Sequence, residues 1–248
     1  LATLTMGEGL TSWSTHSPYN SSSDYDVSGL RYLTLPGTSI PFASSSSVRG
    51  LPSGLLIYVP ASMLEAYRGT SYLSQFRFMA IGSTQTFAVT TTAGGQLQQQ
   101  VEAVATKAEN VLELTVTGPL NGTDIEYLHR YLTNVEVLDL SGASIVNGGD
   151  SYHRWEHAGN VSTQYGDYSY NTEADVAGPF MFANLVGLRT LVLPSGLTSI
   201  GSYTFADCGR LTSLTIPDGV TAIGEQRMGT DSRPPDHRRG GRTGHHLI

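Results

Sequence analysis

The strongest constraint on the fold of this chain is a tandem repeat that runs from Phe182 to Gly224. A shift of 23 residues places one half of this stretch on the other, so that Phe182 falls on Phe205. Seven further pairs keep the same offset: Leu188 and Leu211, Leu191 and Leu214, Leu193 and Ile216, Pro194 and Pro217, Leu197 and Val220, Ile200 and Ile223, and Gly201 and Gly224. A fixed period of this length is typical of supersecondary units that stack on one another.

The spacing within one unit predicts its local structure. Leu191 and Leu193 fall on the same side of a short strand, because side chains alternate along a strand. Pro194 ends the strand, since proline has no N–H to donate to a neighbouring strand. The period and the L-x-x-L-x-L spacing are those of a leucine-rich repeat. We therefore predict the α/β class: a leucine-rich-repeat solenoid of short parallel strands, with turns or short helices on its outer side.

The same spacing recurs upstream and predicts a first module over residues 1–82. Leu30, Leu33 and Leu35 form one unit, and Ile57 and Val59 follow in the next. Residues 61–76 then have helical periodicity, and residues 76–82 have the pattern of a closing strand. We expect these two segments to cap an array, and we place the boundary between modules at 82–83. Leu1, Leu4 and Met6 already have repeat spacing, so we expect the chain to be a fragment of a longer array.

The second module is predicted to cover residues 83–228. We expect a strand at 86–94 and an amphipathic helix at 95–107. A second helix would begin with Thr123 as N-cap and Glu126 as the third helical residue, the pattern of a capping box. The residues expected on the buried faces of the two helices are Leu97, Val101, Val104, Ala108, Ile125, Leu128 and Leu132. Cys208 occupies the repeat position of Leu185, so we expect it to be a small buried residue.

Two segments depart from the repeat. Residues 146–179 form an insertion in the unit between Leu138 and Leu191, and this insertion is rich in tyrosine. After Met228 the positions that should be apolar are Pro234, His237 and Arg239. We therefore expect residues 229–248 to be disordered or to result from a frameshift.

Composition and charge exclude several kinds of partner. The net charge is −7 with a pI near 5.4, which argues against nucleic acid, because phosphate binding needs basic patches. No apolar run is long enough to span a membrane, so we predict no membrane insertion. A charged fraction of 14% with abundant Ser, Thr, Gly and Tyr favours an extracellular β-rich protein.

Motifs for catalysis or metal binding are weak. His153 and His157 have the spacing of two ligands on a helix, but no third ligand follows. Gly94 and Gly95 precede a predicted helix without the remaining glycines or the lysine of a P-loop. There is no G-x-S-x-G sequence. We predict no catalytic residues, no metal site and no cofactor, and hence no enzyme.

The repeat LTSLTIPDGVTAIG, with an x-F-x-x-C-x-x-L sequence between units, closely resembles the BspA-like leucine-rich repeats of bacterial surface proteins. NVEVLDLSGASIVNGGDSY looks like the N-terminal part of such domains, and IYVPASMLEAYR is similar to their C-terminal cap. Together the resemblance covers about residues 1–228. It implies a cell-surface or secreted protein that mediates adhesion by binding host or bacterial proteins, with an extracellular protein as the partner.

Two groups of residues are candidates for partner contacts. The first is the outward column of the strands, whose candidate contacts are Tyr32, Tyr58, Thr115, Asp139, Thr190 and Thr215. The second is the ring set of the insertion: Tyr152, Trp155, Tyr165, Tyr168 and Tyr170. Alternatively, the threonines serve β-propensity alone, and the rings pack on the flank of the repeats to hold a long loop. The rings could also stack on a glycan, or the protein could be a passive structural spacer.

Overall fold

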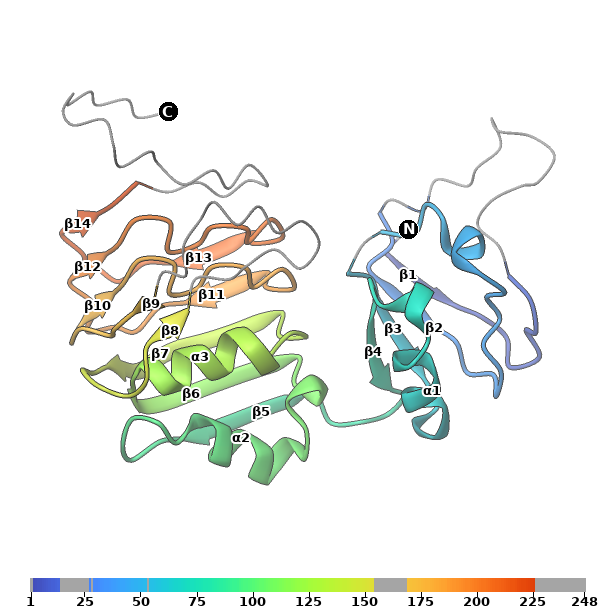
Figure 1. Cartoon of the computed structure of the whole chain (residues 1–248), viewed down its shortest axis with the longest axis horizontal. Coiled ribbons are helices and arrows are strands. Elements are labelled where there is room, and N and C mark those ends of the chain that lie inside the picture. The colour runs from blue at the N-terminus through green and yellow to red at the C-terminus, as the bar shows by residue number, and fades with distance from the viewer. Residues whose placement is uncertain (1, 14–26, 28, 53, 154–168, 226–248) are drawn as a thin grey trace.

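The computed structural model describes residues 2–13, 27, 29–52, 54–153 and 169–225 of the 248-residue chain. Two parallel sheets dominate it (Figure 1). The four-stranded sheet has the order β1-β2-β3-β4, and the five-stranded sheet has the order β13-β11-β7-β6-β5. In both sheets neighbouring strands follow the order of the chain, as expected when successive repeats stack.

The first unit contains the four-stranded sheet and one short α-helix. Its strands are β1 (Thr3–Thr5), β2 (Tyr32–Thr34), β3 (Leu56–Val59) and β4 (Arg77–Ala80), and its helix is α1 (Leu64–Arg68). The predicted closing strand is present as β4. The helix expected over 61–76 is instead five residues of α-helix between two 3-10 turns, Ala61–Met63 and Ser71–Leu73. Gly69 ends this helix, and its N–H donates to the carbonyl of Glu65.

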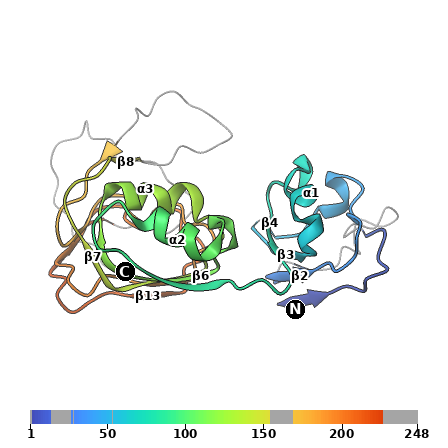
Figure 2. The same ribbon diagram turned by 90° about the horizontal axis from the view of Figure 1, so that it is seen from below.

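The second unit contains the five-stranded sheet, two helices and two minor sheets. The main strands are β5 (Thr86–Thr90), β6 (Glu113–Leu120), β7 (Val137–Ile145), β11 (Thr190–Val192) and β13 (Ser213–Thr215). The helices are α2 (Leu97–Ala105) and α3 (Gly122–Tyr131). The minor sheets comprise β8 (Tyr152–His153) with β9 (Ser169–Tyr170), and β10 (Val176–Ala177), β12 (Ser199–Ile200) and β14 (Ala222–Ile223). Both helices lie on one side of the five-stranded sheet (Figure 2).

The 23-residue period appears directly in the register of the strands. Leu191 of β11 pairs with Leu214 of β13 on one side and with Leu138 of β7 on the other. Phe182 and Phe205, which are also one period apart, stack with ring centroids 6.3 Å apart and an angle of 8° between their planes. Equivalent positions of successive repeats therefore contact one another, and each repeat completes the core of the next.

Each unit has its own hydrophobic core. The first is built around Leu33, Ile57 and Phe78. The second runs from Val89 to Cys208 and includes the predicted helix residues Leu97, Val101, Ala108, Ile125, Leu128 and Leu132. Cys208 is buried as predicted, and its Sγ donates to the carbonyl of Phe182 at 3.0 Å. Burial raises the pKa of this thiol to about 11.

Two details of the helices differ from the prediction. Val104 of α2 was expected on the buried face but is 50% exposed, because the buried face of this helix is formed by Leu97, Val101 and Ala105. Helix α3 is capped by Asn121 and Asp124 rather than by Thr123 and Glu126. Strand β6 runs to Leu120 and α3 starts at Gly122, so the capping pair lies two residues earlier than the sequence pattern indicated.

Candidate functional site

The side of the five-stranded sheet that points away from the helices is called here the outward face. Leu114, Leu138 and Leu191 point into the core, so their neighbours in each strand point outward. The outward residues form two rows in register: Thr86, Glu113, Val137, Thr190 and Ser213; and Ala88, Thr115, Asp139, Val192 and Thr215. All ten are half-buried or exposed.

Polar side chains on the outward face bond to their neighbours. Thr86 Oγ1 donates to Glu113 Oε2 at 3.0 Å. The hydroxyls of Thr90 and Thr117, which lie two residues after Ala88 and Thr115 in their strands, are 2.7 Å apart. Asp139 accepts a hydrogen bond from the backbone N–H of Ser141 at 2.9 Å. In the two rows the face therefore carries hydroxyl groups on four of its five strands, together with two acidic side chains.

The corresponding face of the first sheet is engaged by the second unit. The hydroxyl of Tyr32 donates to Glu136 Oε2 at 2.7 Å, and that of Tyr58 donates to Gln85 Oε1 at 3.2 Å. Leu56 and Met79 lie in the same two rows as these tyrosines and are fully buried, although neither belongs to the core of the first unit. Tyr32 and Tyr58 were expected on an open column. The structure places them, half-buried, at the junction of the two units.

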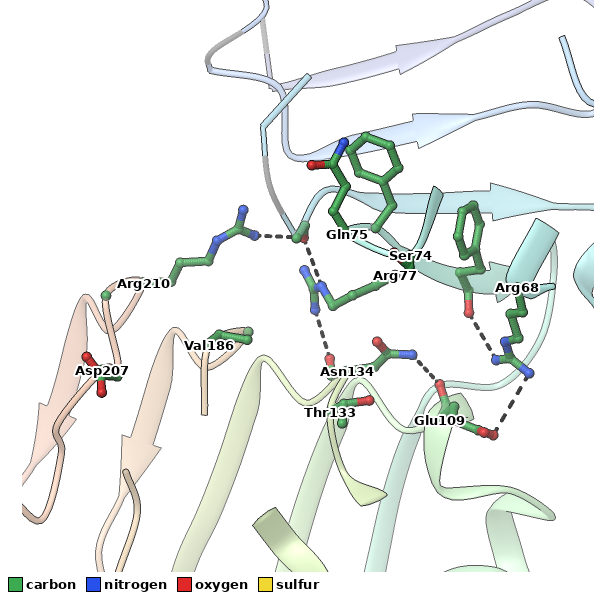
Figure 3. Close-up of a pocket in the computed structure, with 15 residues that line it drawn as sticks. Arg68, Ser74, Gln75, Arg77, Glu109, Thr133, Asn134, Val186, Asp207 and Arg210 are labelled. Atoms are coloured by element: carbon green, nitrogen blue, oxygen red, sulfur yellow. Dashed lines mark hydrogen bonds and ion pairs between the residues drawn. The ribbon is translucent and has the colours of Figure 1, made fainter. Parts of the chain in front are cut away.

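An ion-pair network around Glu136 forms the centre of this junction. Arg77 and Glu136 are 8% and 3% exposed, and Arg77 Nη2 lies 2.6 Å from Glu136 Oε1. Arg77 also donates from Nε to the carbonyl of Gly54 and from Nη1 to the carbonyl of Asn134. Arg189 Nε lies 3.0 Å from Glu136 Oε2. One buried carboxylate thus joins β2 and β4 of the first unit to the second unit (Figure 3 shows the Arg77 side).

The electrostatics of Glu136 follow from these contacts. Burial alone would raise the pKa of its carboxyl group. The hydrogen bonds from Arg77 and Tyr32, with the charges of Arg77 and Arg189, outweigh burial and hold the pKa below its usual value. Burial, followed by the hydrogen bond to Glu136, raises the pKa of Tyr32. Glu136 is therefore ionised at neutral pH, with a charged partner on each oxygen.

A cleft of about 970 Å³ lies between the two units beside this network. The first unit contributes Arg68 and Arg77 to its walls, and the second unit contributes Asn134, Val186 and Arg210 (Figure 3). Arg210 Nη1 donates to the carbonyl of Gly54 at 3.0 Å, so Arg77 and Arg210 share this acceptor. Glu109, also in the wall, lies 3.9 Å from Arg68.

The aromatic insertion is described only in part. Tyr152 is fully buried, lies edge-on to His129 and stacks on Tyr170, and its hydroxyl donates to the carbonyl of Pro179 at 3.0 Å. Tyr170 also packs against Phe180. These two rings thus hold the insertion against the repeats. The other predicted ring residues, Trp155, Tyr165 and Tyr168, lie outside the described residues.

The backbone of His153 belongs to β8, whereas His157 lies outside the described residues. Within the described part of the chain, no three His, Cys, Asp or Glu side chains gather in an arrangement that could hold a metal ion. The same part contains no helix long and apolar enough to cross a membrane.

The repeat spacing in the sequence gives an indication of part of the Glu136 network. Glu136 and Arg189 each lie two residues before an aligned strand leucine, Leu138 or Leu191. Residues at equivalent positions of adjacent repeats stack, so this carboxylate and this guanidinium are brought together by the repeat itself. Arg77 has a weaker signal, since it is a charged residue within an apolar strand. Nothing in the spacing connects Arg77 to Glu136.

Comparison with known families agrees with the repeat register. The family model described as BspA type leucine rich repeat region (6 copies) matches residues 169–229. No curated protein matches the chain. Residues 169–229 cover the strands β9 to β14, including β11 and β13, whose pairing follows the 23-residue period. Residues 169–229 therefore match BspA-type leucine-rich repeats, which confirms the resemblance inferred from the repeat unit itself.

Proposed function

We propose that this chain is a non-enzymatic protein that binds a protein partner on the outward face of its five-stranded sheet. The observation that carries the proposal is the unbroken register of the two outward rows from β5 to β13. Adjacent strands are about 4.8 Å apart, so the rows hold the hydroxyl groups of Thr86, Thr115, Thr190, Ser213 and Thr215 on a rigid support. Repeat proteins bind partners on such extended faces.

The face also limits the chemistry of the partner. Its charged side chains are Glu113 and Asp139, both acidic, and the remaining outward residues are small or β-branched. Opposite charges across an interface favour association and exclude wrong partners. We therefore expect the facing surface of the partner to be neutral or basic.

The proposal also includes the location of this chain and its role there. BspA-type repeats occur over residues 169–229, and the family resemblance implies a surface or secreted protein that adheres to host or bacterial proteins. We place this chain in that class. Binding to a glycan through the aromatic insertion has less support, because Tyr152 is buried and Tyr170 is held between Tyr152 and Phe180. A passive spacer would leave the outward face without a partner.

The test is a binding screen of the purified chain against extracellular-matrix proteins, followed by substitutions on the face. Thr115→Lys combined with Thr190→Lys places two long cations in adjacent outward rows. We expect this double variant to weaken binding of a captured protein by at least about tenfold, through repulsion and lost hydrogen bonds. The matched control is Val104→Lys, which adds a cation on α2, on the other side of the sheet.

The control variant should bind as the original chain does. Equal binding by the double variant and the control would place the contact elsewhere and contradict the proposal. Failure of the folded chain to bind any protein in the screen would support the spacer instead. A circular-dichroism melting curve for each variant shows whether a loss of binding reflects unfolding.

A further inference from the structure

Asparagine followed directly by glycine occurs twice in the sequence, as Asn121–Gly122 and as Asn147–Gly148. In this dipeptide the backbone nitrogen of the glycine can attack the side-chain amide of the asparagine, because glycine has no Cβ to hinder the approach. The attack expels ammonia and is called deamidation. Since the two pairs have the same sequence, a difference in their reactivity must come from the structure around them.

The first pair is held rigidly at the start of α3. Asn121 Oδ1 accepts the N–H of Thr123 at 3.1 Å as the cap of this helix. The N–H of Gly122 donates to the carbonyl of Gly148 at 3.1 Å. Gly122 is also tightly packed, since an added Cβ would overlap the carbonyl oxygen of Asp150. Deamidation at this pair would require the loss of the cap and of the hydrogen bond of the attacking nitrogen.

The second pair lies in an exposed turn after β7. Asn147 and Gly148 are both exposed and belong to no helix or strand. Gly148 has a φ of +102°, and an added Cβ would meet no atom within 4 Å. Its N–H donates to no acceptor among the described residues. The attacking nitrogen is therefore not engaged, and the backbone around it has room to move.

The side-chain amide of Asn147 is polarised for attack. Its Oδ1 accepts a hydrogen bond from the backbone N–H of Ala174 at 2.7 Å. Such a bond stabilises the negative charge that develops on a carbonyl oxygen when a nucleophile adds to the carbonyl carbon. The amide nitrogen, which is the leaving group, donates to no acceptor in the described part of the chain.

We propose that Asn147 is a site of spontaneous deamidation, whereas Asn121 is protected by the fold. The nitrogen of Gly148 forms a bond to Asn147 Cγ, the Cγ–Nδ2 bond breaks, and Nδ2 leaves as ammonia with the proton of the Gly148 N–H. The product is a cyclic imide. Water then opens this ring at either of its carbonyl groups, which gives aspartate or isoaspartate at position 147. In the isoaspartate form the main chain is longer by one methylene group.

Isoaspartate at position 147 weakens the attachment of the chain that leads into β10. The carbonyl of Gly148 accepts hydrogen bonds from Thr172 Oγ1, at 3.2 Å, and from the N–H of Gly122. The side chain of Asn147 holds the N–H of Ala174. A longer main chain displaces both acceptors, and each lost hydrogen bond lowers stability. Deamidation is thus a slow, irreversible change that loosens this part of the second unit.

The experiment is ageing of the folded chain at mildly alkaline pH, followed by trypsin digestion and mass spectrometry. Trypsin separates the two pairs, since residues 108–130 and 131–154 form different peptides. Fragment masses distinguish Asn147 from Asn134 in the second peptide. We expect deamidation at Asn147 to be at least about tenfold faster than at Asn121, because reaction at Asn121 must first break the helix cap. In urea the two rates should become similar.

A second measurement tests the structural consequence. Asn147→Gln is the matched control, because glutamine keeps an amide at this position but would have to form a larger and less favourable ring. The urea midpoint of the original chain should fall on ageing, in proportion to its isoaspartate content. The midpoint of Asn147→Gln should stay constant over the same time.

Three results would overturn the proposal. One is deamidation at Asn121 as fast as at Asn147 in the folded chain. Another is a rate at Asn147 in the folded chain more than about tenfold below its rate in urea, since the turn would then protect this pair as well. The third is an equal fall of the urea midpoint in the original chain and in Asn147→Gln. The site includes no residue of the two outward rows, so its test is independent of the proposed function.

Discussion

Glu136 is the residue on which the junction of the two units depends. It is 3% exposed and contacts Tyr32, Arg77 and Arg189. A buried ion pair adds little stability compared with a well-packed apolar pair, but removal of one partner leaves the other charge buried and uncompensated. The cost of breaking this network should therefore be much larger than its net contribution.

Glu136→Gln should lower the free energy of unfolding by about 3 kcal/mol, because Arg77 would remain buried without a negative partner. Urea unfolding at neutral pH measures this. Glu113→Gln is the matched control, since Glu113 is an exposed carboxylate at the start of β6, and it should change stability by less than about 0.5 kcal/mol. Equal losses in the free energy of unfolding from the two substitutions would contradict the role assigned to the Glu136 network.

The same residue predicts a dependence of stability on pH. The pKa of Glu136 in the folded chain lies below the ordinary value of 4.5. The unfolded chain therefore binds this proton at a higher pH than the folded chain does, and the contribution of Glu136 is complete above the ordinary value. It is lost as pH falls through 4.5 toward the lowered pKa. Urea midpoints at several pH values below neutrality should fall more steeply in the original chain than in Glu136→Gln.

Individual residues also show what the sequence could predict. The apolar positions of the repeat were predictable because strand alternation and a fixed period determine which side each residue faces. Tyr32 was assigned to an exposed column by the same alternation. Its partner Glu136 is 104 residues away, in another unit. Repeat spacing describes neighbours within one array and contains no information on how two arrays meet.

At the scale of the secondary-structure elements, one carboxylate, that of Asp124, connects the N-termini of α2 and α3. Asp124 is 1% exposed and accepts hydrogen bonds from the backbone N–H groups of Gly95, Leu97 and Asn121, at 2.6, 2.8 and 2.9 Å. It thus caps α3 and also satisfies donors at the start of α2, where the side chain of Gln96 makes no capping bond. A pattern search for a capping box identifies one helix at a time and does not reveal this shared use.

Asp124→Ala should lower the free energy of unfolding by about 3 kcal/mol, since three buried or half-buried N–H groups would lose a charged acceptor. Glu126→Ala is the control at the position that the sequence pattern had assigned to the cap. Its carboxylate pairs with Arg130 on the helix surface, and such pairs contribute about 0.5 kcal/mol. Chemical denaturation of both variants shows whether Asp124 or Glu126 caps α3. A larger loss from Glu126→Ala would restore the sequence-based cap.

In the whole molecule, the outward faces of the two sheets differ in their accessibility to solvent. The predicted class of parallel-strand repeats is present, and successive strands follow chain order (Figure 1). The outward face of the five-stranded sheet stays accessible, whereas buried Leu56 and Met79 and hydrogen-bonded Tyr32 show that the corresponding face of the first sheet is covered from β2 to β4. This difference arises from long-range contacts of Arg77, Glu136 and Arg210, which composition and periodicity do not specify.

Thiol labelling tests this central claim most directly. Cys208 is the only cysteine of the chain; it is buried, and burial raises its pKa to about 11, so the original chain should react slowly. Thr215→Cys places a thiol on the outward face of β13, and Leu56→Cys places one on the covered face of β3. We predict rapid labelling at 215 and protection at 56, with protection lost when Glu136→Gln is added. Equal labelling at 56 and 215 in the otherwise unchanged chain would contradict the account.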